Sequence, residues 1–110
     1  MIEDRIRNIE ARINGTERLP AETKAELKAL LEALRTEIAA LPATHGEDAD
    51  SIARFAEASA HEATRSEQKP KLLNAALEGL GGSVEEFEVS HPKLAETLNR
   101  IAVILANMGM

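Results

Sequence analysis

The three histidines of this sequence are the residues most easily compared with known catalytic and metal-binding motifs. His61 and Glu62 begin a stretch close to a zinc motif in which two histidines four positions apart bind the metal and the glutamate acts as a base. Arg65 stands where that motif has its second histidine. Because a fixed positive charge there would repel the metal, we expect a solvated helix face of Glu57, His61 and Arg65.

Glu88 and His91 have the spacing of the Glu-x-x-His unit of di-iron bundles, in which a carboxylate and an imidazole one turn apart point into a helical core. Such a site needs a second unit and two further glutamates, and the sequence has no second unit. The unit also abuts Pro92, a residue typical of a helix start. We therefore predict that His91 or Ser90 caps free backbone N–H groups at a helix boundary.

His45 lies in a connection flanked by proline and glycine, with Glu47, Asp48 and Asp50 nearby. Several carboxylates close together suggest a cation site, but their spacing fits no calcium loop. Negative side chains also stabilise the first turn of a helix through its dipole. We expect an acidic helix start here and no metal site.

Nucleophilic catalysis and phosphate binding have no candidate residues either. No serine lies in a Gly-x-Ser-x-Gly elbow, and Gly79, Gly81 and Gly82 lack the Lys-Ser or Lys-Thr that follows a phosphate-binding loop. The chain has no cysteine, which excludes thiol nucleophiles and thiolate metal sites. The sequence therefore predicts no catalytic, cofactor-binding or metal-binding residue, and a protein that is not an enzyme.

Apolar residues at alternating spacings of three and four predict the helices that position these side chains. The first helix is expected to end at a left-handed cap formed by Asn14 and Gly15. The second is expected to begin near Pro20 and to end before Pro42. Their apolar stripes consist of Ile2, Ile6, Ile9 and Ile13, and of Leu27, Leu31, Leu34, Ile38 and Leu41.

A third helix is predicted to run to Lys69, just before Pro70. Its start is open, because Thr44 has capping-box spacing while Asp48 is a rival cap. One face consists of alanines, which allow close approach to a partner with larger residues, such as the leucine stripe of the second helix. This face comprises Ala49, Ala53, Ala56, Ala60 and Ala63, widened by Ile52 and Phe55.

The stripe after Pro70 keeps one helical phase through Gly81 and Gly82, although each glycine costs a helix interior about 1 kcal/mol. Ser83 and Glu86 have the capping-box spacing that could restart a helix. A helix kinked or interrupted at the glycines and two separate helices are both consistent with this pattern. The stripe comprises Leu73, Leu77, Leu80, Val84 and Phe87.

A last helix is predicted to begin near Pro92, with Leu94, Leu98, Ile101, Leu105 and Met108 on its stripe. Acid-first charge pairs four positions apart are expected to support three of the helices. These pairs are Glu3 with Arg7, Asp50 with Arg54, and Glu96 with Arg100.

The composition fits helices packed on helices within one domain of residues 1–110. Hydrophobic residues make up 44% of the chain, mostly Leu, Ile and Ala, and Phe55 and Phe87 are the only aromatic residues apart from the histidines. Strand-forming runs of β-branched and aromatic residues are missing. We predict an all-α fold, a small antiparallel helical bundle of four or five helices with coiled-coil-like seams.

The net charge of -6 is spread along the chain, and neither half is basic. Nucleic-acid binding needs clustered Lys and Arg, and anionic membrane surfaces would repel this chain, so we expect neither partner. The first five residues lack the basic start of a signal peptide, and no apolar run reaches the roughly 20 residues of a membrane span. The expected location is the cytoplasm.

The last third of the chain, residues 83–110, resembles a bacterial family known as domain of unknown function 4404. The resemblance lies in Phe87-Glu88, Ser90-His91-Pro92, Leu98-Asn99-Arg100 and the run Leu105-Ala106-Asn107-Met108-Gly109. It implies no activity, cofactor or catalytic residue. Ser90, His91 and Asn99 remain open between a binding role and helix capping and packing, and we favour capping and packing.

These patterns predict a non-enzymatic helical module for self-association or protein interaction. A small-molecule or lipid-binding bundle is the alternative, which an apolar cavity beside the alanine face would favour; a metal-binding protein or enzyme is less favoured. Residues 101–106 are apolar on every side, which predicts a homodimer interface made by Ile101, Ile104, Leu105 and Met108. In the competing explanation, the last helix lies at the centre of its own bundle and the protein is monomeric.

Overall fold

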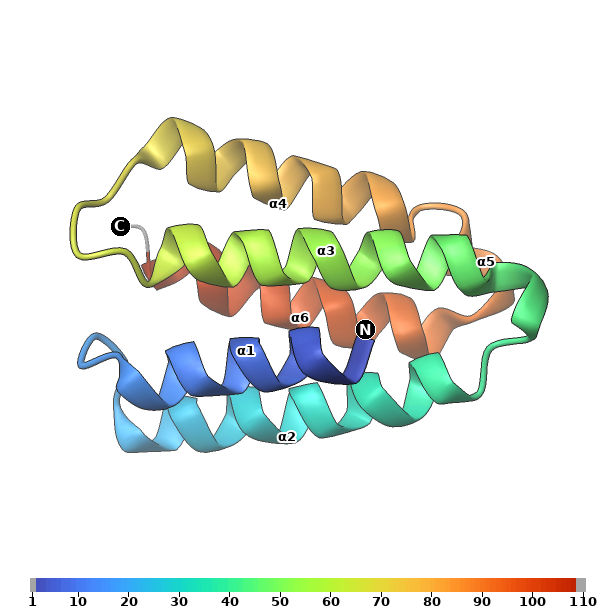
Figure 1. The fold of residues 1–110 in the computed structure, drawn as a ribbon, viewed down its shortest axis with the longest axis horizontal. Coiled ribbons are helices and arrows are strands. Elements are labelled where there is room, and N and C mark those ends of the chain that lie inside the picture. Colours follow the sequence, from blue (N-terminus) through green and yellow to red (C-terminus); the bar gives the residue numbers. More distant parts are fainter. Residues whose placement is uncertain (1, 109–110) are drawn as a thin grey trace.

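The computed structural model describes residues 2–108, and these residues form helices and no strand (Figure 1). The predicted all-α class is confirmed. Five α-helices have 14 or more residues, and α5 is a single turn. The elements are α1 (Ile2–Gly15), α2 (Ala21–Ala39), the 3₁₀ turn η1 (Ala43–His45), α3 (Gly46–Ala63), α4 (Pro70–Val84), α5 (Phe87–Ser90) and α6 (Pro92–Met108).

Successive long helices run in alternating directions along the molecule, so that each short connection reverses the chain (Figure 1). Helix α3 packs against α1 and α4, while α6 packs against α2, α4 and also α3. Helix α6 lies behind α3 in the view of Figure 1. The last helix therefore has bundle neighbours on three sides and one outer face.

The apolar stripes form one continuous core, as the spacing predicts. The alanine face of α3 is buried, but it packs mainly against α1 and α4 rather than against α2. Small alanine side chains let these helices come close together. The buried core residues from the predicted stripes are Ile6, Ile9, Ile13, Leu27, Leu31, Leu34, Ile38, Leu73, Leu80, Val84, Phe87, Leu94, Leu98, Ile101 and Leu105.

The predicted left-handed cap at the end of the first helix is wrong. Gly15 belongs to α1, and no residue from 2 to 108 has a positive φ. The Lys24 ammonium donates a hydrogen bond of 3.3 Å to the Asn14 carbonyl. A cation at the last turn satisfies a free carbonyl and opposes the helix dipole, which removes the need for a glycine cap.

Helix α3 ends at Ala63 and not at Lys69, because side chains from outside the helix bind its last carbonyl. Arg18 Nη1 and Gln68 Nε2 donate to the Ala63 carbonyl at 3.0 and 2.9 Å. Arg18 Nη2 also donates to the Ser66 carbonyl at 3.4 Å. The helix start is settled as well: η1 precedes Gly46, and no side-chain cap forms at His45.

Helix α4 continues unbroken through Gly81 and Gly82 to Val84. The break falls after the glycines, before α5. The Ser83 hydroxyl donates to the Leu80 carbonyl at 2.7 Å within α4, so Ser83 does not cap a new helix. The continuous helical phase of the apolar stripe therefore predicted the course of α4 better than the two glycines did.

Candidate functional site

His61 lies exposed on α3, as predicted, but its companions do not form a solvated face with it. Arg65 Nη1 lies 2.9 Å from Glu62 Oε1, and both residues are partly buried. Glu57 faces α1 instead, where Arg5 and Asn8 donate to its carboxylate at 2.6 and 2.8 Å. Burial raises the pKa of Glu57, but these two hydrogen bonds and the positive charges of Arg5 and Arg12 together hold the pKa below its ordinary value.

His45 and His91 lie together at one end of the bundle, where both rings contact Phe87. The ring centroids are 5.2 Å apart for His45 and Phe87, 5.6 Å for Phe87 and His91, and 5.9 Å for the two histidines. All three contacts are edge-to-face, a favourable aromatic arrangement. This cluster ties the α2–α3 connection to the α5–α6 connection.

The Nδ1 atom of each of these two histidines lies close to a polar side chain nearby in the sequence. His45 Nδ1 lies 3.3 Å from Asp48, and His91 Nδ1 lies 3.0 Å from the Ser90 hydroxyl. The predicted side-chain cap by His91 or Ser90 is therefore replaced by ring packing and a local hydrogen bond. Within residues 2–108, no group of three His, Asp or Glu side chains could hold a metal ion.

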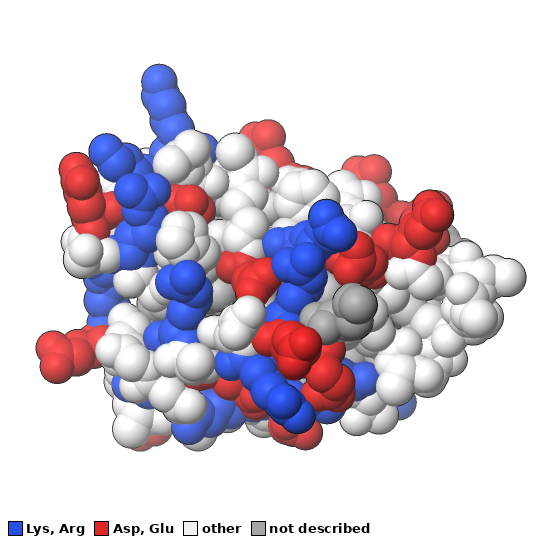
Figure 2. All heavy atoms as spheres, viewed as in Figure 1, with Lys and Arg blue, Asp and Glu red and all other residues white. Residues whose placement is uncertain are grey.

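The three predicted charge pairs have different outcomes. Arg54 donates to Asp50 at 2.8 Å, as expected. Glu3 instead lies 3.0 Å from Arg35, which also contacts Glu10 and Glu32. On the face shown in Figure 2, acidic and basic side chains are intermingled, while the tip of the molecule near η1 shows none.

Glu96 and Arg100 form no ion pair or hydrogen bond with any side chain of residues 2–108, although they are one turn apart on α6. The same spacing in α3 brings Asp50 and Arg54 together. The two α6 charges are therefore free to bind an outside group.

The predicted interface residues divide between the core and the surface. Ile101 and Leu105 are each 1% exposed, so the chain's own helices already cover them. Ile104 and Met108 are partly buried and border the outer face of α6. Val103 on the same face is 58% exposed, and its exposure was not foreseen from the sequence.

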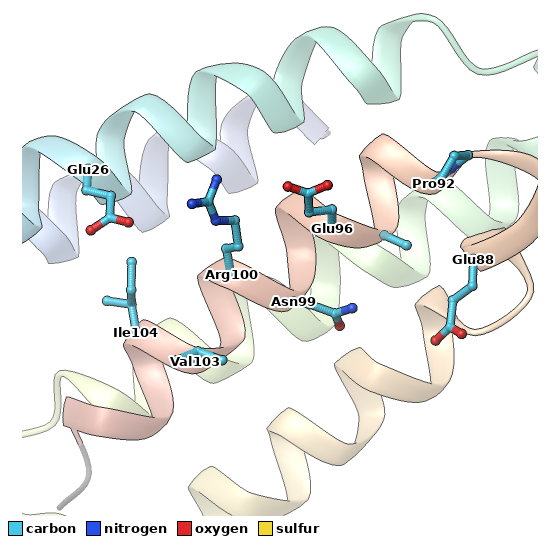
Figure 3. Close-up of a pocket in the computed structure, with 9 residues that line it drawn as sticks. Glu26, Glu88, Pro92, Glu96, Asn99, Arg100, Val103 and Ile104 are labelled. Atoms are coloured by element: carbon cyan, nitrogen blue, oxygen red, sulfur yellow. The ribbon is translucent and has the colours of Figure 1, made fainter.

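Two adjoining pockets of about 570 and 280 Å³ follow this outer face, and Ile104 lines both. We call them together the α6 trough. Figure 3 shows Glu26 reaching from α2 toward Ile104, with Glu88 on the other side of α6. The larger pocket is lined by Glu26, Glu88, Pro92, Ala95, Glu96, Asn99, Arg100, Val103 and Ile104, and the smaller by Arg18, Leu19, Pro20, Thr23, Ile104, Asn107 and Met108.

A third pocket, of about 360 Å³, lies beside His91 at the start of α6. It is lined by Glu37, Ala40, His91, Pro92, Lys93 and Leu94. A cavity beside the alanine face of α3 would favour the alternative of a small-molecule or lipid-binding bundle. None of these three pockets is lined by the alanines of α3.

The fold and this surface define the chain as a small all-helical bundle with a trough along its last helix. Residues 27–110 match the family described as Domain of unknown function (DUF4404), and the chain belongs to that family. The match begins within α2 and takes in all the elements that follow it, so it extends well beyond the segment that carries the resemblance. No curated protein and no solved structure gives a significant match. Among residues 2–108 no helix has the length and apolar character needed to cross a membrane.

Proposed function

We propose that this chain is a non-enzymatic helical module that works by docking another protein surface along the α6 trough. The observation that carries the proposal is Val103, a large apolar side chain 58% exposed on the trough floor beside Ile104. Apolar surface gains roughly 25 cal/mol for each Å² removed from water, so a covering partner would be stabilised there.

The surroundings of Val103 have the make-up of a protein interface. Protein interfaces combine an apolar centre with a polar rim. Here Pro92, Ala95 and Ile104 continue the apolar floor, and the charged side chains of Glu26, Glu88, Glu96 and Arg100 surround it.

The use of the histidines supports a role outside catalysis. His45 and His91 pack on Phe87, which is 1% exposed, and each has a local partner for its Nδ1 atom. His61 lies exposed on α3 and lines neither pocket of the trough. The groups best suited to move protons at neutral pH are thus outside the trough.

A photoreactive phenylalanine analogue placed at position 103 tests the proposal in the cells that make the protein. We expect irradiation to give one discrete adduct of higher mass, because the docked partner covers that position. The matched control is position 89 on α5, where Val89 is 94% exposed but stands outside the trough. Equal labelling at both positions, or no adduct at position 103, would contradict docking along α6.

A further inference from the structure

Glu96 and Arg100 border the trough floor, and like Glu26 and Glu88 their side chains have no ion pair or hydrogen bond within residues 2–108. They are four positions apart on α6, and Figure 3 shows them side by side on one side of the helix. A surface with one acid and one base a helical turn apart is complementary to itself when a second copy runs in the opposite direction, because each charge then meets its opposite.

We infer that the trough binds a second copy of this chain, related by a two-fold axis that sets the two α6 helices antiparallel. This inference rests on the proposed docking function. The axis lies level with Leu98, midway between Glu96 and Arg100. Glu96 of each copy then lies beside Arg100 of the other, and two ion pairs form across the interface.

The same register brings together residues that were not used to choose it. Pro92 is six positions before Leu98 and Ile104 is six positions after it, so the apolar ends of the two troughs meet. These apolar contacts therefore fall in the same register as the two ion pairs.

Other occupants fit this charge pattern less well. A parallel second copy would place Glu96 beside Glu96 and Arg100 beside Arg100, and like charges repel. A basic helix would be attracted by Glu26, Glu88 and Glu96. It would however be repelled by Arg100 in the middle of the trough and by Arg18 at its end. An anionic lipid surface would be repelled by Glu26, Glu88 and Glu96.

Charge reversal tests the cross-pairs directly, with mass measured by light scattering on a sizing column. The wild-type chain should have twice the mass of 11.9 kDa, and Glu96→Arg and Arg100→Glu should each raise the dissociation constant at least tenfold. A mixture of the two variants should recover the dimer, because every cross-pair is then opposite in charge. Arg7→Glu on α1 is the control, with the same charge change as Arg100→Glu and no expected loss of dimer.

Engineered cysteines test the antiparallel direction, since the natural chain has none. With the axis at Leu98, position 103 of one copy lies level with position 93 of the other, whereas two copies of position 103 are offset by roughly 15 Å along the helices. A mixture of Lys93→Cys and Val103→Cys should therefore form a disulfide-linked dimer under mild oxidation, whereas Val103→Cys alone should not. Efficient linking of Val103→Cys to itself would overturn the antiparallel arrangement.

The outcomes of these experiments distinguish a failure of the second-copy inference from a failure of the proposed docking function. A position-103 photoadduct at a mass other than twice that of the chain overturns the second copy and leaves docking in place. Single charge variants that stay dimeric, or a mixture that fails to recover the dimer, overturn the register. A wild-type chain that stays at 11.9 kDa up to high micromolar concentration overturns the second copy altogether.

Discussion

At the scale of single residues, the ring of Phe55 leaves no room for a side chain at position 79. The ring of Phe55 on α3 lies so close to the backbone of Gly79 that an added Cβ would overlap it. The ring is 39% exposed, so it lies at the rim of the α3–α4 contact. An added Cβ at Gly81 or Gly82, by contrast, would meet nothing within 4 Å.

Alanine substitutions should separate these glycines. Gly81→Ala and Gly82→Ala should each raise the free energy of unfolding by about 0.5–1 kcal/mol, because alanine is the better helix former. Gly79→Ala should lower it, because the Phe55 ring must leave its contact. Urea unfolding measures all three. In a Phe55→Ala background Gly79→Ala should become stabilising, and a persistent loss there would contradict the explanation.

Glu57 makes part of the stability dependent on pH. Burial raises its pKa, but the hydrogen bonds from Asn8 and Arg5 and the charges of Arg5 and Arg12 bring it below the ordinary value of 4.5. A carboxylate with a lowered folded pKa contributes its full stabilisation above the ordinary value and loses it as the pH falls through the folded value. Glu57 therefore favours the folded state at neutral pH and ceases to do so in acid.

Glu57→Gln should reveal this contribution. We expect a loss on the order of 0.5–1 kcal/mol at neutral pH, since the ion pair with Arg5 is partly exposed, and a smaller difference from wild type in acid. Unfolding by urea at pH 7 and at pH 3 measures both. A difference that grows as the pH falls would contradict the assigned cause.

At the scale of elements, the apolar stripes were enough to place each long helix, because burial depends on local spacing. The stripe of α4 predicted a continuous phase through Gly81 and Gly82, and the helix is continuous there. The end of α3 was not predictable in this way. Its last carbonyl is bound by Arg18, which lies 45 positions earlier in the chain.

The end of α3 should therefore depend on Arg18. We expect Arg18→Ala to lower the free energy of unfolding by about 1 kcal/mol, because two carbonyls lose a charged donor. Amide hydrogen exchange should quicken in the last turn of α3 while the first turn stays unchanged. The control is Arg7→Ala, also an exposed arginine, and an equal effect from it would show that general charge loss is responsible.

The candidate site was only partly predictable for the same reason. Residues 101–106 read as apolar on every side, which suggested that the last helix needs extra cover. The order of helices around the bundle decides which of these residues the chain covers itself, and that order depends on long-range packing. Ile101 and Leu105 face the core, whereas Val103 faces out. The cluster of His45, Phe87 and His91 also joins segments distant in sequence.

At the scale of the whole molecule, the fold leaves one side of α6 open, where Val103 is exposed between charged side chains. The bundle covers α6 with α2, α3 and α4. The trough follows its remaining side and includes the largest of the three pockets. Docking along this face explains why Val103 is exposed and why Glu96 and Arg100 have no partners within residues 2–108.

Sedimentation equilibrium of the wild-type chain and Val103→Lys tests this account most directly. With the axis at Leu98, position 103 lies level with Lys93 of the other copy, so a lysine there would oppose docking by like-charge repulsion. Val103 is exposed enough for the variant to fold. We predict a wild-type mass of twice 11.9 kDa, a Val103→Lys mass of 11.9 kDa with unchanged helicity, and a Val89→Lys control that stays dimeric. A monomeric wild-type chain, or a Val103→Lys variant that remains dimeric, would contradict it.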